Sequence, residues 1–412
     1  MIHINYGLHN EPCFYVWRIF AENNTILATP VSITSIASFS PLGNNPNSIW
    51  ESYLTSQSLI KSTLIGGKNI PAAVLSQDLI AQVNELKNSS THYKNIDKSV
   101  LYALLAARAA VANAGWNEDD IFGINVGSSR GATELFENHL EEFLSTGKAA
   151  VQASPATTLG NISSWVAHDL KSTGPEISHS ITCSTALHAL LNGVAWLRAG
   201  MATKFLVGGS EAPLTPFTIA QMQAMKIYSN NIDGDYPCRA LDLAKTQSSM
   251  VLGEGAGMAC LELGNVTGAP AYIQGIGYAT EVLQHSVSIS AEADCMQKSM
   301  RMALEGIDPS EIDAVVMHAP GTVKGDTSEY AAIQKVFGAN LPLLTTNKWK
   351  IGHTFGASGL LSLEFAVLML QHNHFIPSPF MPQQAGRPLK KILVNAVGFG
   401  GNAVSVVVSK EV

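Results

Sequence analysis

The sequence predicts an α/β protein built from two fused halves, because one succession of helices and strands occurs twice along its 412 residues. The first copy has a helix over 99–115 that ends at a glycine, followed by a strand over 122–127. The second copy has a helix over 295–306, also ending at a glycine, followed by a strand over 314–317. Since such elements pack in layers, we expect each half to be a sheet covered by helices. One doubly wound sheet is the alternative that the same alternation allows.

A second pair of segments matches further along each half. After Cys183 comes a helix with apolar residues spaced three and four apart, and then a strand over 204–208. Its counterpart is a helix over 359–371, followed later by a strand over 391–395. The repeated order of elements supports the two-half interpretation.

The repeat breaks near 264–270, which predicts the boundary between the halves. We therefore expect a first half over 31–264 and a second half over 265–412. Residues 1–30 stand outside the repeat and form an N-terminal extension.

Composition excludes some classes of function. Charged residues make up 14% of the chain, below the roughly 25% usual for soluble domains, and apolar residues make up 46%. This balance predicts a large buried interface and hence an oligomer. The formal net charge of -7 shows no excess of basic residues of the kind that binds nucleic acid.

Neither a membrane helix nor a disulfide scaffold is predicted. The longest apolar stretch, 359–370, contains Glu364 and falls short of the ~18 residues that a membrane span needs. The first 29 residues contain no unbroken apolar core of a secretory signal. The five cysteines are scattered with no C-x-x-C pair, which disfavours disulfides and zinc. We expect a cytoplasmic protein.

Cys183 is the first candidate for chemistry. A β-biased run over 176–182 ends at this residue, where an amphipathic helix begins. The free N–H groups of a helix N-terminus favour a thiolate, and strand–turn–helix is also the context of acyl-transfer nucleophiles. A buried structural cysteine is the alternative.

Two histidines are the next candidates. His318 follows an apolar strand and precedes a tight turn, a position at which active-site loops of α/β sheets commonly lie. His353 sits in a glycine-punctuated loop that opens a helix, and it is the internal counterpart of the Cys183 position. A structural or surface role is the alternative for each. Phosphate binding by this loop is disfavoured, since the P-loop pattern is absent.

The segment 395–402 carries three glycines after an apolar strand. Such glycines let backbone N–H groups turn inward, as an oxyanion hole requires. A tight hairpin between two strands explains the same residues, and we expect both.

Together these elements resemble the elongating β-ketoacyl synthases, which are condensing enzymes of the thiolase-like superfamily. The matching motifs occur in order: T-C-S at Cys183, P-C-R-A-L-D and V-L-G-E-G-A-G within 237–257, H-A-P-G-T with G-D-x-x-E within 318–329, N-K-x-K-I-G-H-T-x-G-A-S-G over 347–359, and G-F-G-G-N. The resemblance runs from about residue 31 to residue 408. It implies a five-layered αβαβα core of two duplicated halves.

The resemblance also implies an activity, decarboxylative Claisen condensation of an acyl-cysteine with malonyl-acyl carrier protein in fatty-acid or polyketide biosynthesis. In such an enzyme Cys183 accepts the acyl chain, His318 and His353 bind the malonyl thioester carbonyl, and Lys348 supports His353. The backbone N–H groups of Cys183 and Phe399 form the oxyanion hole.

Further roles follow from the same resemblance. Phe399 also gates the acyl pocket, and Thr322 and Gly400 contact the pantetheine arm. The expected partners are an acyl carrier protein and a second subunit, in a homodimer or a heterodimer. No metal or other cofactor is expected, because the substrates are carried on phosphopantetheine.

Three positions depart from the pattern. Pro320 replaces a residue whose hydroxyl holds the pantetheine arm, although Thr322 can still serve. Ser362 stands where the family usually has glutamate, and Glu364 lies about 200° away on a helix. Arg130 falls where the family's pocket meets its dimer partner, and we expect it to form an ion pair across the dimer. These departures favour a secondary-pathway synthase, for example for polyene chains.

Two rival functions remain. One is a non-condensing partner subunit that sets chain length, but such partners usually lose the nucleophile. The other is a thiolase, which uses a second cysteine late in the chain; here no cysteine follows Cys295.

Overall fold

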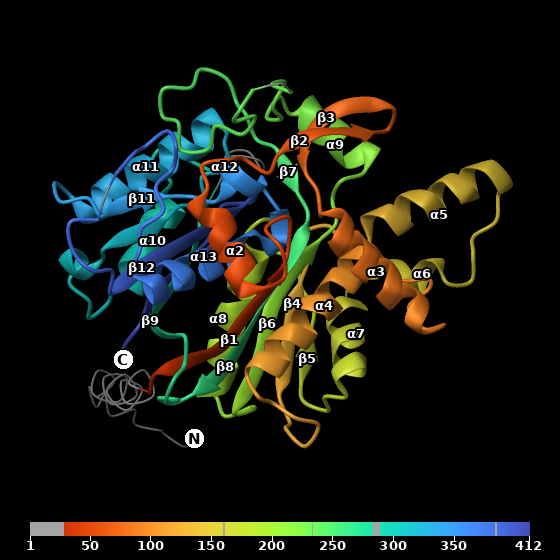
Figure 1. The fold of residues 1–412 in the computed structure, drawn as a ribbon, viewed down its shortest axis with the longest axis horizontal. Helices are drawn as coiled ribbons and strands as arrows, with labels where there is room; N and C mark the ends of the chain where they lie inside the picture. The colour runs from red at the N-terminus through yellow and green to blue at the C-terminus, as the bar shows by residue number, and fades with distance from the viewer. Residues whose placement is uncertain (1–28, 160, 233, 283–288, 384) are drawn as a thin grey trace, which may run out of the picture.

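The computed structural model describes residues 29–412 except 160, 233, 283–288 and 384. The predicted extension 1–30 therefore lies almost wholly outside the described residues. Two five-stranded sheets form the frame of the molecule (Figure 1). The expected α/β fold of two sheet-based halves is confirmed, and the alternative of one doubly wound sheet is wrong.

The first sheet has the strand order β1-β8-β6-β4-β5. Its strands are β1 (Val31–Phe39), β8 (Gly255–Leu263), β6 (Lys204–Glu211), β4 (Gly123–Gly127) and β5 (Glu176–Ile177). Strands β5, β4 and β6 run parallel, and β8 and β1 are added antiparallel.

The second sheet has the order β11-β10-β12-β13-β9. Its strands are β11 (Leu343–Thr345), β10 (Ala314–Val316), β12 (Lys391–Gly398), β13 (Asn402–Ser409) and β9 (Ala271–Thr280). Three parallel strands are again followed by two antiparallel ones. Both sheets thus share one topology, as the repeat in the sequence predicts. The boundary at residue 264 stays a prediction.

Helices form the other three layers. Helices α8 (Thr185–Arg198) and α13 (Ser358–His372) share one apolar core with residues of both sheets, so they lie between them. A second core joins the first sheet to α3 (Gln77–Ser89), α4 (Lys98–Asn113) and α7 (Asn161–Leu170). A third joins the second sheet to α10 (Asp294–Ala303) and α11 (Val323–Phe337).

The remaining elements lie around these layers. They are the small sheet of β2 (Lys61–Ile65), β3 (Lys68–Ala73) and β7 (Leu252–Gly253), the helices α2 (Pro46–Leu54), α5 (Thr133–Thr146), α6 (Ala153–Thr157), α9 (Pro216–Ala224) and α12 (Lys348–Ile351), and the 3-10 turns η1 (Pro309–Glu311) and η2 (Phe355–Ala357).

Helix α13 is buried almost completely, because both of its faces pack against sheets. Together with the turn before it, the segment 355–372 is long and apolar enough to cross a membrane, which corrects our expectation that no stretch reaches that length. In the structure 89% of this segment is buried, as in the core helix of a layered protein.

The strand expected over 176–182 is also shorter than predicted. Only residues 176–177 pair with β4, and the chain then leaves the sheet. Thr182 adopts a left-handed conformation with φ of 47°, which turns the backbone into the start of α8. The β-propensity of these residues does not predict this turn, because the turn depends on packing against the second half of the chain.

Candidate active site

One cavity of about 400 Å³ collects most of the residues singled out by the sequence. Its lining, called here the Cys183 cavity, consists of Cys183, Met225, Ile227, Ser248, Met250, Ile289, His318, Pro320, Thr322, Lys324, Gly325, His353, Phe355, Val397, Gly398 and Phe399. Four segments singled out by the sequence, at 183, 318–322, 353 and 397–399, therefore meet at one place.

Cys183 lies at the start of α8, directly before the helical residues, as predicted. Its side chain is 6% exposed, and burial raises the pKa of its thiol to about 12, with a further increase from Glu211. The charge of Lys348 acts in the opposite direction. Burial therefore opposes the thiolate that we expect from the position at a helix N-terminus. The effect of the helix N-terminus on the thiol stays a prediction.

His318 and His353 both line the Cys183 cavity and contact each other edge to face. Their ring centroids are 5.1 Å apart and the rings are nearly perpendicular. Burial lowers the pKa of His353 to about 3 and that of His318 far below its usual range, and the charge of Lys348 adds to both effects. Both imidazoles are thus neutral at physiological pH. A neutral imidazole can donate through one ring nitrogen and accept through the other.

A buried carboxylate, Glu329 on α11, holds the loop that carries His318. Its two oxygens accept the backbone N–H groups of His318 and Ala319 over 2.9 and 2.8 Å. Asn395 donates to the same carboxylate over 3.2 Å. These bonds stabilise Ala319 in a left-handed conformation with φ of 27°. Glu329 therefore fixes the direction in which the His318 side chain leaves the backbone.

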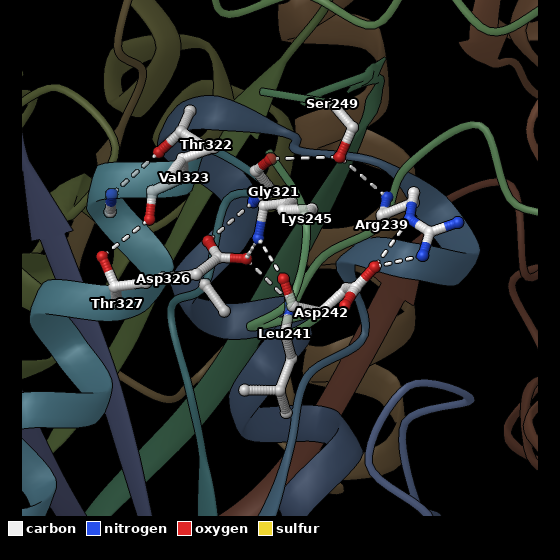
Figure 2. Close-up of polar contacts among 12 residues, drawn as sticks. Arg239, Leu241, Asp242, Lys245, Ser249, Gly321, Thr322, Val323, Asp326 and Thr327 are labelled. Carbon is white, nitrogen blue, oxygen red and sulfur yellow. Dashed lines mark hydrogen bonds and ion pairs between the residues drawn. The ribbon is translucent and has the colours of Figure 1, made fainter. Parts of the chain in front are cut away.

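A second carboxylate holds the following turn, as Figure 2 shows. Asp326 is fully buried and accepts from the backbone N–H groups of Gly321 and Leu241 over 3.0 and 2.8 Å. The ammonium group of Lys245 lies 2.6 Å away and neutralises it. The segment before β7 is thus attached to the turn that precedes Thr322.

A third buried carboxylate connects the two halves beside Cys183. Glu211, at the end of β6, accepts from the hydroxyl of Ser128 and the backbone N–H groups of Ser129, Arg130 and Gly356 over 2.7–3.1 Å. Burial outweighs these bonds and raises the pKa of Glu211 to about 7. This residue attaches the loop after β4 to the turn that follows His353.

Sequence reasoning assigned no role to these three carboxylates. Asp326 and Glu329 stand in the G-D-x-x-E motif, and Glu211 follows a strand in G-G-S-E. An acidic residue directly after an apolar strand is the signal that could have marked Glu211. Its four donors come from two segments, 128–130 and Gly356, that lie far apart in the sequence, so only the folded chain identifies it as a connection.

The glycine-rich segment 398–401 closes the hairpin between β12 and β13, as one interpretation predicts. It also approaches Cys183, because the hydroxyl of Thr182 donates to the carbonyl of Phe399 over 3.4 Å. A side chain on Gly398 would place its Cβ 1.9 Å from that hydroxyl, so only glycine fits. Gly400 takes φ of 91° in the turn and does not line the Cys183 cavity. Phe399 lines it and is 37% exposed.

Lys348 lies behind the cavity lining and is 1% exposed. Its ammonium group donates to Asn347 Oδ1 and to Ser362 Oγ, each over 3.0 Å. Burial lowers the pKa of Lys348 to about 8. Ser362 thus lies beside Lys348. Glu364 lines a different cavity, as expected from its position about 200° further around the helix.

The other two departures have different consequences. Pro320 lines the Cys183 cavity beside Thr322, whose hydroxyl accepts the N–H of Gly325 as the N-cap of α11. Arg130 does not line that cavity, and its guanidinium donates to Gln221 on α9. An ion pair of Arg130 across a dimer stays a prediction.

The assembled site combines a buried thiol, two neutral imidazoles and glycine-rich backbone. Within the described residues, no group of three or more His, Cys, Asp or Glu side chains is arranged to hold a metal ion. The four described cysteines are all free thiols. Imidazoles and backbone N–H groups that line one cavity with a thiol suit a reaction in which negative charge develops on a substrate oxygen.

Comparison with known proteins identifies relatives along most of the chain. The model of the β-ketoacyl synthase N-terminal domain matches residues 28–265, and that of the C-terminal domain matches residues 271–380. The chain is 27% identical over 411 residues to 3-oxoacyl-[acyl-carrier-protein] synthase 2 of Staphylococcus aureus strain COL, covering 91% of this chain and 97% of that protein. It is 29% identical over 419 residues to the synthase of the same name from Coxiella burnetii, covering 92% and 98%.

A solved structure shares the fold. It is described as a type II polyketide-synthase acyl-carrier protein in complex with its ketosynthase bound to the hexaketide. The TM-score is 0.81 at 21% identity, and the match covers 93% of this chain and all of that chain (100%).

Proposed function

Since this chain belongs to the β-ketoacyl synthase family, we propose that it catalyses the decarboxylative Claisen condensation of an acyl-cysteine with malonyl-acyl carrier protein. The observation that supports this most directly is the meeting of Cys183, His318 and His353 in one cavity. The proposal extends to the role of each of these residues.

In the first half-reaction Cys183 takes the acyl group from a pantetheine thioester. A bond forms between Sγ and the carbonyl carbon, the bond to the pantetheine sulfur breaks, and the proton of Cys183 ends on the leaving thiol. With a thiol pKa of about 12, proton removal must accompany attack, and a neutral imidazole of His353 or His318 can accept that proton. The N–H groups of Cys183 and Phe399 stabilise the oxyanion.

In the second half-reaction the malonyl thioester loses CO2. The electron pair of the broken C–C bond forms an enolate, whose oxygen accepts from the Nε2–H groups of His318 and His353. The enolate carbon attacks the acyl carbonyl, the bond to Sγ breaks, and the Cys183 thiolate takes up one proton from solvent. The products are CO2 and a β-ketoacyl thioester two carbons longer.

The neutrality of the two imidazoles favours this assignment. A donor whose pKa is far below neutrality stays an uncharged hydrogen-bond donor and does not protonate the enolate. Burial is the main cause of the low pKa of both histidines, and the charge of Lys348 lowers it further, which we propose as the function of Lys348. Thr322 would contact the pantetheine arm, together with Gly400 at the turn, and Phe399 would gate the cavity.

We propose an acyl carrier protein and a second synthase subunit as partners, in a homodimer or heterodimer, and a cytoplasmic location. The similar ketosynthase described above was solved with its acyl-carrier protein. A non-condensing partner subunit is not favoured, because Cys183 and both histidines are present in the cavity.

The departures at Pro320 and Ser362 support a secondary pathway, for example one making polyene chains. Comparing turnover of saturated and unsaturated acyl carriers of equal length tests this. Faster turnover of long saturated chains would refute it.

The condensation itself is tested by intact-mass spectrometry. Wild type and Cys183→Ala are incubated with acyl-acyl carrier protein, and malonyl-acyl carrier protein is then added. We expect an acyl adduct on wild type only, which disappears as the elongated product forms. Cys238→Ala is the matched control, since Cys238 is buried and outside the cavity lining, and it should retain the adduct. A folded wild type that never forms an adduct would support the non-condensing alternative.

A further inference from the structure

A second cavity, of about 170 Å³, opens between β1, α2 and α13. It is called here the Glu364 cavity, and it is lined by Thr34, Ser35, Ile36, Pro46, Asn113, Pro270, Glu364, Leu368 and Gln371. None of these residues lines the Cys183 cavity. Helix α2 lies next to α13 here (Figure 1). Tyr53 of α2 stacks on Phe365 of α13, with 4.3 Å between the ring centroids.

The inner part of this cavity is polar and incompletely paired. Glu364 is 3% exposed, and its Oε2 has no hydrogen-bond partner among the described residues. Ser35 is equally buried, and its hydroxyl is also without a partner there. Buried polar atoms are normally paired, and an unpaired carboxylate is costly to bury. The buried Glu364 oxygen therefore lacks a hydrogen-bond donor among the described residues.

The charges of the lining residues favour a positively charged ligand in this cavity. Apart from Glu364, the lining contains neutral side chains only. Burial raises the pKa of Glu364 to about 7, although Ser38 lies near enough to oppose this slightly. Burial raises the pKa of Tyr53, and the negative charge of Glu364 raises it further. A donor of charge +1 would both restore the missing hydrogen bonds and neutralise this carboxylate.

The walls of the cavity restrict the kind of cation. Ile36, Pro46, Pro270 and Leu368 line it with hydrocarbon, whereas the exposed amides of Asn113 and Gln371 stand at its rim. A hydrated alkali ion would place water against these apolar walls. An alkyl chain ending in an ammonium group would instead bury its methylenes there. The volume is about five times the ~30 Å³ that a water molecule takes up in the liquid, enough for a short chain.

We propose that the Glu364 cavity binds the ammonium group of a small alkylamine. The ammonium donates to the Glu364 carboxylate and the Ser35 hydroxyl, and the carbon chain contacts the apolar walls. The site is separate from the condensation chemistry and does not rest on it.

Calorimetric titration of the full chain with n-butylammonium chloride tests the proposal, with tetramethylammonium chloride and KCl at equal ionic strength as comparisons. We expect saturable binding of butylammonium at one site. Tetramethylammonium has no N–H to donate and should not bind. KCl should not compete; competition by KCl at equal concentration would instead identify an alkali-ion site and overturn the alkylamine proposal.

Two variants identify the location. Glu364→Gln removes the charge while keeping the shape, and it should weaken butylammonium binding at least tenfold. Gln371→Trp covers the rim from an exposed position, so folding is preserved, and it should weaken binding similarly. Both should keep the far-UV circular dichroism spectrum of wild type, which reports an intact fold independently of any acyl transfer. Unchanged affinity in either folded variant, or no binding to wild type, refutes the proposal.

Discussion

The buried ammonium group of Lys348 donates to the hydroxyl of Ser362 over 3.0 Å, and Asn347 supplies its other acceptor at the same distance. Both acceptors are neutral. Among the described residues no carboxylate oxygen lies within ion-pair distance of this lysine. The cation beside the two histidines is therefore held by hydrogen bonds to neutral oxygens.

We predict that Ser362→Ala lowers the free energy of unfolding by about 1–3 kcal/mol, because it leaves a buried cation with one acceptor fewer. Urea denaturation measures the change. Ser358→Ala is the matched control: Ser358 lies in the same helix, is similarly buried, and has a hydroxyl without a partner in the described part of the chain. Its replacement should cost nothing measurable. Equal losses in the two variants would show that the bond from Lys348 contributes little.

The lowered pKa of Lys348 predicts a dependence of stability on pH. Its folded-state pKa of about 8 lies below the ordinary value of 10.5, so between these values the unfolded chain binds more protons. Stability therefore rises with pH in this window, by up to about 1.4 kcal/mol per pH unit from this residue. The unfolding free energy of wild type relative to Lys348→Met should increase between pH 8 and 9.5. Lys350, whose pKa is also lowered to about 8, is present in both proteins. The difference between their unfolding free energies therefore reports Lys348. Parallel profiles of wild type and variant would contradict the assignment.

Gly398→Ala should abolish acyl transfer without unfolding the protein. The new Cβ would lie 1.9 Å from the Thr182 hydroxyl, so the loop carrying Phe399 must move away from Cys183. Loss of one oxyanion donor typically costs about 10²–10³ in rate, and we expect at least that in the rate of adduct formation.

Gly386→Ala serves as the control for this substitution, because a Cβ at Gly386 meets no atom within 4 Å. It should acylate at the wild-type rate. Adduct formation by Gly398→Ala at an unchanged rate would argue against an oxyanion hole that includes Phe399.

Lys245→Met should destabilise the protein by about 3–5 kcal/mol, because Asp326 would remain buried without its counter-ion. The exposed pair of Lys98 and Glu134 provides the comparison, and Lys98→Met should change stability by at most about 1 kcal/mol. Thermal and urea unfolding measure both. If Lys245→Met proves as mild as Lys98→Met, the attachment of the turn before Thr322 does not depend on the ion pair.

Much of the fold was predictable from the sequence, because its local signals agree with the final packing. The helix expected over 359–371 forms as Ser358–His372, and the strand expected over 391–395 forms within Lys391–Gly398. The strand expected over 176–182 mostly does not form, because contacts with the second half turn the chain toward α8. The family was recognised from ordered motifs, and the matching family models confirm it.

The sequence by itself determined the repeat of two sheet-based halves and the positions of Cys183, His318 and His353 at the ends of elements, since hydrophobic period, glycines and motif order are local properties. Only the tertiary structure decided the chemical state of these groups. Burial, which depends on segments hundreds of residues apart, makes the thiol of Cys183 a weak acid and the imidazoles neutral. The same long-range packing selects Ser362 as the partner of Lys348 and leaves Glu364 in a cavity without one. The desolvation of a group and its hydrogen-bond partners depend on all the residues that surround it in space. The order of residues along the chain does not specify those neighbours directly.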